Sequence, residues 1–306
     1  MKFWWKGAMA ASVMAAASLV GGSAFAQSPC PVCGPQAEAK KIDPAIYHVA
    51  DEMGLVRSTS LLIGQMHIIE MAGSGKMVDL EAATLGQPVD VSKITWNVNM
   101  QLHASRVTYQ AGSTQTIRVV KNGRGWNETW TADKKKLNTA PVDPAVAALR
   151  SQLVWFEPHA FITAAAFASD KKCLLDTAKA CSNAVSVGQE NGKTVITVEM
   201  DGTTYKGTVD AKNRIASVEG TIKLPGGAAK KLVATYGPWR SGEKIEVPHD
   251  PDYGKNSMDQ FHNGNYFPEK ITWDLDGTRV LDLAITAGWG NPYTVYPEPE
   301  LLAKAQ

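Results

Sequence analysis

Apolar and polar side chains alternate along the chain between residues 91 and 105. Apolar residues occupy every second position in this stretch: Ile94, Trp96, Val98, Met100, Leu102 and Ala104. A period of two predicts a long strand with one apolar and one polar face. Residues 115–120 and 125–130 predict two more strands, joined by Asn122-Gly123, a pair that suits a tight hairpin because both residues tolerate positive φ. The pattern therefore predicts a broad antiparallel sheet whose apolar side needs a cover.

Two Asp-Pro pairs, at 43–44 and 143–144, predict the starts of helices, with Asp as the N-cap and Pro in the first turn. The first helix has an apolar stripe and ends at Gly54. The second is rich in alanine and extends to residue 168, and Pro158 must kink or divide it.

Further strands are predicted on both sides of these central elements. Residues 61–71 and 76–81 predict two strands that turn at Gly73-Ser74-Gly75, and the second half of the chain predicts a run of hairpins, including turns at Asn191-Gly192 and Asp276-Gly277. The predicted fold class is mainly β (α+β). We expect a long, curved antiparallel half-barrel sheet of about ten or eleven strands, covered on its concave face by the N-terminal helix and the central helical insert. Such a fold leaves either a packed core or an apolar cavity.

The first 26 residues have the pattern of a secretory signal peptide. Lys2 and Lys6 precede an apolar run, and Ala24-Phe25-Ala26 is a small-x-small cleavage signal, so the mature chain is expected to begin at Gln27, in the periplasm. A retained membrane anchor and a lipid on Cys30 are the alternatives. The predicted organisation is a signal peptide (1–26), a flexible leader (27–42) and one domain (43–306), with a helical lid insert at 143–182 and a long loop at 238–267.

Four cysteines fit an oxidising compartment and allow three pairings. We expect the local pairing, Cys30 with Cys33 and Cys173 with Cys181. Cys30 and Cys33 also have the spacing of a redox motif, but they follow the cleavage site in a Pro-rich tail rather than opening a helix after a strand, which favours a structural disulfide.

The charge balance bears on the class of partner. The chain has 31 basic and 30 acidic residues, and removal of residues 1–26 takes away two lysines and leaves 29 basic residues. Such a balance argues against a nucleic-acid partner. No apolar run after the signal peptide reaches membrane-spanning length.

Several segments carry a resemblance to a known family. They are WFEPHAF at 155–161, YFP at 266–268, DGTRVLDL at 276–283 and NP at 291–292. With the order of elements, these segments resemble the periplasmic outer-membrane lipoprotein carrier (LolA/LolB-like) superfamily, and most closely a group of uncharacterised exported bacterial proteins, some found beside metallo-β-lactamase-type hydrolases. The resemblance implies a half-barrel plugged by helices. The Cys-x-x-Cys leader and the 238–267 loop depart from the family pattern.

Motifs for catalysis or metal binding are mostly missing. The sequence contains no nucleophile elbow and no zinc-hydrolase pattern, and we expect no cofactor and no metal. The best polar candidate is the loop with His249, Asp250, Asp252 and His262, which is more typical of a solvated loop than of a site. It fails as a calcium loop because the glycine is misplaced and the terminal Glu is missing.

Aromatic residues gather on the predicted sheet face and on its helical cover: Trp96, Trp126, Trp130, Trp155, Phe156 and Phe161. They form an ordinary core or, where a cavity exists, its walls. Our first hypothesis is a periplasmic carrier of a hydrophobic ligand or lipid moiety, for which an outer-membrane or envelope protein is a further candidate partner. The second is an enzyme or hydrolase accessory that uses the His249–His262 loop on a small hydrophobic compound. The third is a structural envelope module with a packed interior.

Overall fold

The computed structural model describes residues 42–55, 68–100, 102–130, 137–171, 184–241 and 266–290. The described helices are α1 (Pro44–Glu52), α2 (Pro144–Val154) and α3 (Pro158–Ser169). The first half of the chain forms strands β1 (Ile68–Met77), β2 (Val89–Asn99), β3 (Ala104–Ala111), β4 (Thr114–Lys121), β5 (Arg124–Trp130) and β6 (Leu137–Pro141). The second half forms β7 (Val185–Glu190), β8 (Lys193–Met200), β9 (Thr203–Val209), β10 (Ile215–Lys223), β11 (Ala229–Tyr236), β12 (Trp239–Ser241), β13 (Tyr266–Pro268), β14 (Lys270–Leu275) and β15 (Thr278–Gly290).

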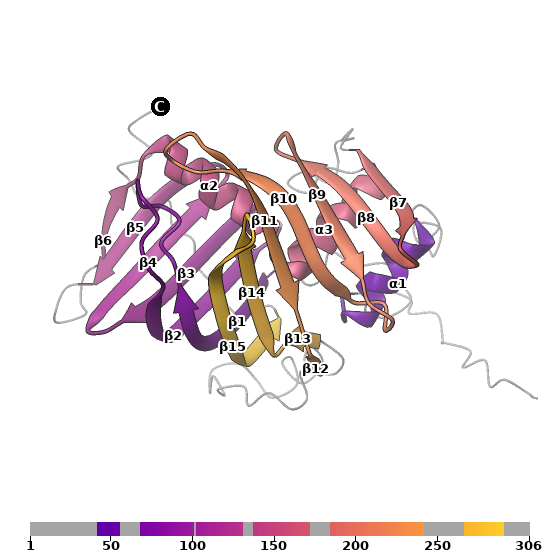
Figure 1. Cartoon of the computed structure of the whole chain (residues 1–306), viewed down its shortest axis with the longest axis horizontal. Coiled ribbons are helices and arrows are strands. Elements are labelled where there is room, and N and C mark those ends of the chain that lie inside the picture. The colour runs from indigo at the N-terminus through magenta and orange to yellow at the C-terminus, as the bar shows by residue number, and fades with distance from the viewer. Residues whose placement is uncertain are drawn as a thin grey trace, which may run out of the picture.

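One antiparallel sheet of 13 strands dominates the fold, in the order β6-β5-β4-β3-β2-β1-β15-β14-β11-β10-β9-β8-β7. Figure 1 shows this order from β6 at one side to β7 at the other. The sheet is open and does not close on itself. Strands β12 and β13 pair separately as a two-stranded sheet. The first and last of the described strands, β1 and β15, pair in the middle of the sheet and join its two halves.

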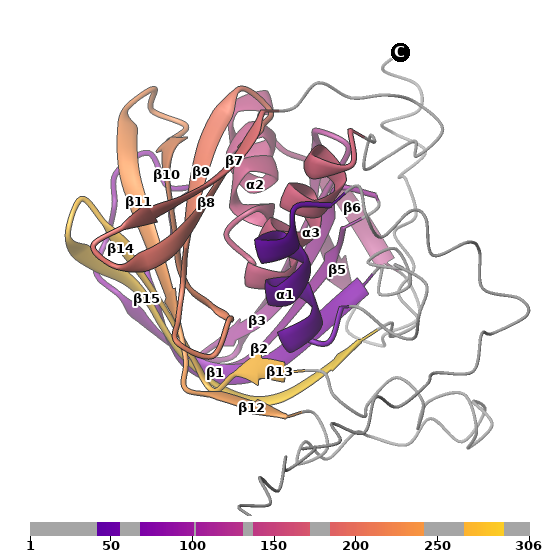
Figure 2. The same ribbon diagram turned by 90° about the vertical axis from the view of Figure 1, so that its right-hand side faces the viewer.

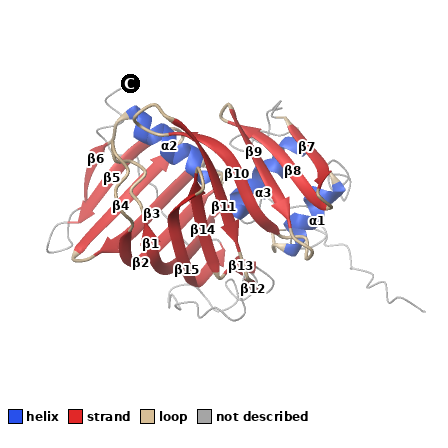
Figure 3. Cartoon of the chain, in the orientation of Figure 1, coloured by secondary structure: helices blue, strands red, loops and turns tan. Residues whose placement is uncertain are grey.

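The helical insert connects the two outer strands of the sheet. The chain leaves β6, forms α2 and α3, and re-enters the sheet at β7. Figures 2 and 3 show both helices, together with α1, on one face of the sheet. The prediction of a mainly β fold with helices covering one face is therefore confirmed.

The predicted helix starts are confirmed. Asp43 and Asp143 accept hydrogen bonds from the backbone N–H groups of Ala45 and Ala145, at 2.9 and 2.8 Å, and a proline follows each of them. Pro158 divides the long helical stretch into α2 and α3, as predicted, with Glu157 as the N-cap of α3.

Helix α3 is a core element with almost no exposed face. Nearly all of its side chains are buried, including Phe161, Ile162 and the alanines at 164–166. A helix that is apolar all round belongs in the interior. Alanines let the sheet and α1 approach closely, and Phe161 packs where Gly207 of β9 leaves room for its ring.

The tight turns follow the sequence signals. Both residues of Asn122-Gly123, Asn191-Gly192 and Asp276-Gly277 have positive φ, at 49° and 76°, 51° and 74°, and 47° and 82°. Each pair joins two antiparallel neighbours, and the predicted hairpins at these positions are confirmed.

The predicted strand count and two of the predicted boundaries are wrong. The main sheet has 13 strands rather than ten or eleven. The alternation from 94 to 104 spans two strands, because the chain turns between Met100 and Ala104 through His103, whose φ is 44°. Residues 73–75 lie inside β1 and not at a turn. The alternation of apolar and polar residue types continues across this turn, where His103 is buried and Leu102 is 37% exposed, so the residue pattern alone does not mark the end of the first strand.

Gly73 and Gly75 lie in a strand where the backbone of the neighbouring strand β15 passes very close to them. A Cβ on Gly73 would lie 2.1 Å from the carbonyl oxygen of Ala284, and one on Gly75 would lie 2.0 Å from that of Asp282. The pairing register shifts at these residues toward both β15 and β2. The glycines therefore mark a bulge with close backbone approach in the middle of the sheet.

We predict that Gly73→Ala lowers the free energy of unfolding by about 2–3 kcal/mol, because the added methyl group meets backbone that can move only with β15. Chemical denaturation measures the change. Gly86→Ala is the matched control, since a Cβ there has no atom within 4 Å and its effect should be small. Equal stabilities of the two variants would contradict the close-approach interpretation.

Candidate functional site

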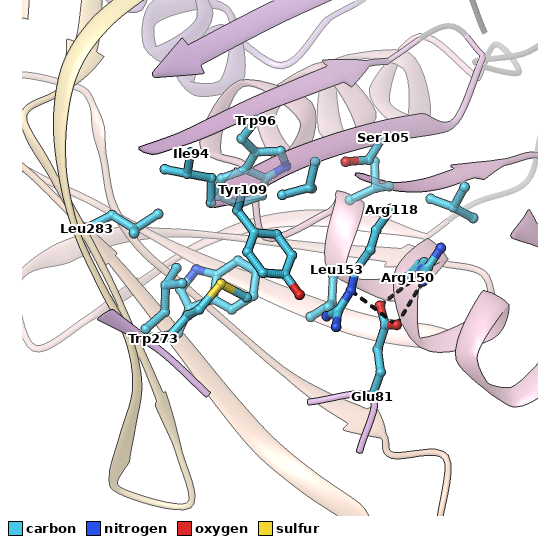
Figure 4. A pocket seen from close by; sticks show the side chains of 15 residues that line it. Glu81, Ile94, Trp96, Ser105, Tyr109, Arg118, Arg150, Leu153, Trp273 and Leu283 are labelled. Carbon is cyan, nitrogen blue, oxygen red and sulfur yellow. Dashed lines mark hydrogen bonds and ion pairs between the residues drawn. The ribbon is translucent and has the colours of Figure 1, made fainter. Parts of the chain in front are cut away.

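An apolar pocket of about 100 Å³ lies between α2 and the middle of the sheet. Strands β1 to β4, β14 and β15 form its sheet side, and α2 forms its other side. The lining side chains are those of Met77, Glu81, Ile94, Trp96, Ser105, Val107, Tyr109, Arg118, Val120, Arg150, Leu153, Val154, Trp273, Leu281 and Leu283. Figure 4 shows apolar side chains at one end and the charged group of Glu81, Arg118 and Arg150 at the other.

Strand pairing explains why these residues share one face. Trp96 of β2 pairs with Val107 of β3, which pairs with Arg118 of β4. Paired residues point to the same side of a sheet, so the three side chains form a row across it. Gly125 of β5 continues the same face, where a Cβ would lie 3.0 Å from that of Ala147. The missing side chain lets α2 settle close to the sheet at that point.

The apolar end of the pocket has an aromatic wall. Trp96 and Trp273 meet edge to face, with ring centroids 5.4 Å apart, and the ring centroid of Phe156 lies 6.2 Å from that of Trp273. Both tryptophans are more than nine-tenths buried. An aromatic pair in this geometry contributes about 0.5–1.5 kcal/mol beyond its buried area, so the contact stabilises the wall.

The charged end of the pocket is closed by the connection between β1 and β2, residues 78–88. Arg118 donates to both carboxylate oxygens of Asp79, at 3.0 and 2.9 Å, and its Nε lies 3.5 Å from Glu81. Its guanidinium also lies 5.2 Å from the ring of Tyr109. These contacts tie the connection to β4, across the face that the helices cover.

Arg150 of α2 completes the closure. It donates from Nε and Nη2 to the two oxygens of Glu81, both at 2.7 Å, and from Nη2 to Asn127 at 2.6 Å. Its Nη1 donates to the carbonyls of Val119 and Trp126, at 3.0 and 2.8 Å. The five N–H groups of a guanidinium thus meet five acceptors. A buried charge with this arrangement is stable, and both cations at the pocket are already paired.

Burial and Arg118 act on Asp79 in opposite directions. Burial raises the pKa of this carboxyl, but the hydrogen bonds and charge of Arg118 outweigh it, so its pKa lies below the ordinary value. Burial lowers the pKa of Arg118, whereas the contacts with Asp79 and Glu81 raise it above its ordinary value overall. The pair is therefore ionised at neutral pH.

The predicted aromatic residues fall in three places. Trp96 lines the pocket. Trp155, Phe156 and Phe161 are buried in the main core beside it, and none of them lines it. Trp126 lies on the opposite face of the sheet, in a small cluster with Ala104, Ile117 and Val119. The side chain of Trp130 lies outside the described residues, and ligand contact by the set stays a prediction.

The opposite face carries its own charged pair. Arg106 and Glu128 pair there, and Glu128 also accepts from the indole N–H of Trp126 at 3.0 Å. Glu70, beside them, accepts from Asn97 at 3.0 Å. Burial raises the pKa of Glu70 above its ordinary value, against the opposing effects of Asn97 and Arg106. The indole of Trp126 thus donates to Glu128 on the opposite face of the sheet, whereas its backbone carbonyl accepts from Arg150 of α2.

A second buried polar pair holds the start of α3. His159 Nδ1 lies 2.8 Å from Glu157, its Nε2 lies 2.8 Å from the carbonyl oxygen of Tyr266, and both side chains are fully buried. Tyr236 donates to the carbonyl of Phe156 at 2.5 Å. Both ring nitrogens of His159 thus face oxygen atoms, and the contact with Tyr266 fixes the start of α3 to β13.

Sequence reasoning missed the charged end of the pocket and its second tryptophan. Arg150 gave one signal, because it stands in the apolar part of α2 between the buried Ala147 and Val154. Arg118 gave another, since it lies within an apolar strand and shares its inner face with Val120. A cation on a core-facing position needs a carboxylate partner. No comparable signal set Trp273 apart from other core aromatics.

The predicted polar site lies outside the described residues, as do its members His249, Asp250, Asp252 and His262. The same is true of Cys30, Cys33, Cys173 and Cys181, and of the signal peptide. Across the parts of the chain that the structure describes, no group of three or more His, Cys, Asp or Glu side chains is placed to hold a metal ion. Among the described helices, none is long and apolar enough to cross a membrane.

We predict that Glu81→Ala lowers the free energy of unfolding by about 3 kcal/mol, because Arg150 would keep its buried charge without a carboxylate. Asp90→Ala is the matched control. Its pair with Lys76 is 3.7 Å long and both side chains are mostly exposed, so the loss should stay within about 0.5 kcal/mol. Denaturant unfolding measures the free energy of unfolding of both variants. A loss in Glu81→Ala as small as that in Asp90→Ala would contradict the buried-pair interpretation.

The pKa shift of Asp79 predicts a loss of stability in acid. Its pKa is lower in the folded than in the unfolded state, so its contribution is complete above the unfolded value of about 4 and is lost as the pH falls through the folded value. Asp79→Asn should therefore flatten the acid side of the profile of unfolding free energy against pH. Glu70→Gln is the contrast. The pKa of Glu70 is shifted in the opposite direction, so its ionised form destabilises the folded state at neutral pH. Removing the charge should therefore raise the free energy of unfolding there. An unchanged acid limb in Asp79→Asn would contradict the assignment.

In the comparisons with known proteins, no protein-family model matches the chain, and no curated protein matches it.

Proposed function

We propose that the protein is exported to the periplasm and binds a small apolar ligand, or the end of an acyl chain, in the pocket between α2 and the sheet. The observation that carries the proposal is the pocket itself, with an aromatic wall at one end and two arginines paired with carboxylates at the other. A space lined by Trp96, Trp273 and aliphatic side chains gains free energy when an apolar group replaces water in it.

The N-terminal pattern supports the exported location, and the resemblance to lipoprotein carriers supports the class of ligand. In this proposal the helix-covered face of the sheet acts as the ligand side of a half-barrel, as the resemblance implies. An outer-membrane or envelope protein would then give or receive the ligand. The disulfides between Cys30 and Cys33 and between Cys173 and Cys181 belong to the same proposal, since they suit an oxidising compartment.

The size of the pocket limits what it holds. An engineered cavity of about 150 Å³ binds benzene, and pockets for drug-sized ligands have about 300–1,000 Å³. A space of about 100 Å³ thus takes a short alkyl segment or a comparably small molecule. A longer chain would have to displace part of the closure.

The 78–88 connection is the part best suited to move. It is held to the body by the charged contacts of Asp79 and Glu81 and by the buried side chains of Val78 and Leu80, and its outer part from residue 83 onward is exposed. Helix α3, in contrast, is buried on nearly all sides and is fixed by Glu157 and His159. Moving α3 would expose most of its apolar surface, so we place ligand entry at the connection rather than at the helical insert.

A series of straight-chain primary alcohols tests the proposal. Affinity should rise by about 0.8 kcal/mol, roughly fourfold, for each methylene that enters the pocket, and should level off once the pocket is full. Val107→Phe, which adds a ring at the pocket wall, should shorten the rising part of the series. Isothermal titration calorimetry measures both effects.

Val89→Phe is the matched control for this substitution. It makes the same change at a position that is 48% exposed and does not line the pocket. Its series should coincide with that of the unchanged protein. Affinities that do not depend on chain length, or that Val107→Phe leaves unaltered, would show that the alcohols do not enter this pocket.

A further inference from the structure

One hydroxyl group in the pocket wall is open and has no partner. Tyr109 of β3 lines the pocket, and Figure 4 shows its hydroxyl directed into the space between Trp273 and Leu153. No hydrogen bond joins this hydroxyl to any residue that the structure describes. It does not belong to the polar atoms that neighbouring atoms fully enclose without a partner, so a molecule the size of water reaches it.

The hydroxyl is held in a fixed place by the strand that carries it. Tyr109 pairs with Ile94 of β2 on one side and with Thr116 of β4 on the other. Its ring lies 5.2 Å from the guanidinium of Arg118, and the residue is only 9% exposed. A polar group that is already in position loses little conformational freedom when a ligand binds to it.

This hydroxyl favours an occupant that carries an oxygen atom. An occupant displaces water from the space, and a pure hydrocarbon would leave the O–H group of Tyr109 without an acceptor in apolar surroundings. Such a group costs free energy, and native proteins leave few of them. An oxygen on the occupant would instead replace the hydrogen bond that water makes in solution.

The charge of the occupant follows from the arginines. Arg118 and Arg150 are the cations that line the pocket, and their carboxylate partners, Asp79 and Glu81, already neutralise them. An anionic group placed beside them would also meet the carboxylate of Glu81, which lines the pocket itself. The pocket therefore favours an uncharged occupant.

We propose that Tyr109 determines the specificity of the pocket. Its hydroxyl forms a hydrogen bond with the single oxygen of an uncharged apolar molecule, such as an alcohol, ketone or ester, whose hydrocarbon part lies against Trp96 and Trp273. This inference rests on the proposed binding function and narrows its ligand class.

Three probes of matched chain length test the proposal on the whole protein: 1-pentanol, pentane and pentanoate. We expect 1-pentanol to bind more tightly than pentanoate in NMR titrations. Tyr109→Phe removes only the hydroxyl, so it should lower the ratio of 1-pentanol to pentane affinity about three- to tenfold without weakening the binding of pentane. Nuclear Overhauser effects should connect the C1 protons of 1-pentanol with the ring of Tyr109, and its methyl group with the indole of Trp96.

Tyr47→Phe is the matched control. It makes the same chemical change in α1, at a residue that does not line the pocket, so the affinity ratio should stay unchanged. Ser105 carries the other hydroxyl among the described lining residues. A fall of the ratio in Ser105→Ala but not in Tyr109→Phe would overturn the assignment of the oxygen to Tyr109.

Two further results separate this inference from the function on which it rests. An unaltered ratio in Tyr109→Phe, or binding of pentanoate as tight as that of 1-pentanol, would overturn the proposed specificity and leave apolar binding intact. Failure of all three probes to bind would contradict the proposed binding function itself.

Discussion

The interaction on which the arrangement depends is the complete pairing of Arg150. This one side chain joins α2 to the carbonyls of β4 and β5 and to Glu81 of the 78–88 connection. A buried guanidinium is stable only where its N–H groups find acceptors at hydrogen-bond distance. These hydrogen bonds therefore fix the position of α2 relative to the sheet. Leu153 and Val154, on the next turn of the same helix, then line the helix side of the pocket.

The same constraint couples the two faces of the sheet. The carbonyl of Trp126 accepts from Arg150 on the inner face, while its indole N–H donates to Glu128 on the outer face. Glu128 in turn pairs with Arg106. Neutralised charges therefore flank β5 on both sides, and the apolar end of the pocket lies away from them, under Trp96 and Trp273. A pocket with this division favours apolar groups over ions, because its charges are already paired.

Local signals in the sequence predicted local structure well. Asp43, Asp143 and Pro158 placed the helix ends, and the Asn-Gly and Asp-Gly pairs placed the hairpins, because caps and tight turns depend on a few adjacent residues. Pairing between strands that lie far apart in the sequence was harder to predict. The pairing of β1 with β15 joins residues more than two hundred positions apart, and nothing near Gly73 indicates that its missing side chain admits another strand.

The candidate site shows the same contrast between local signals, which could be predicted, and long-range contacts, which could not. Trp96 could be predicted as a wall residue because alternation placed it on the apolar face. Trp126 was grouped with it, although the intervening pairings put it on the other face of the sheet, and only the register of β3, β4 and β5 reveals this. The partners of Arg118 and Arg150 come from a connection that carries no regular pattern. The charged end of the pocket therefore could not be predicted from the sequence.

The measurement that tests the central claim most directly is native mass spectrometry of the protein purified from its natural host, followed by solvent extraction of the sample. The account predicts a co-purifying uncharged apolar molecule that is released on unfolding. It also predicts that the bound fraction falls when a phenylalanine replaces Val107. A mass equal to that of the protein without a ligand, together with no uptake of apolar probes, would contradict the account and identify the space beside α2 as an ordinary gap in the core.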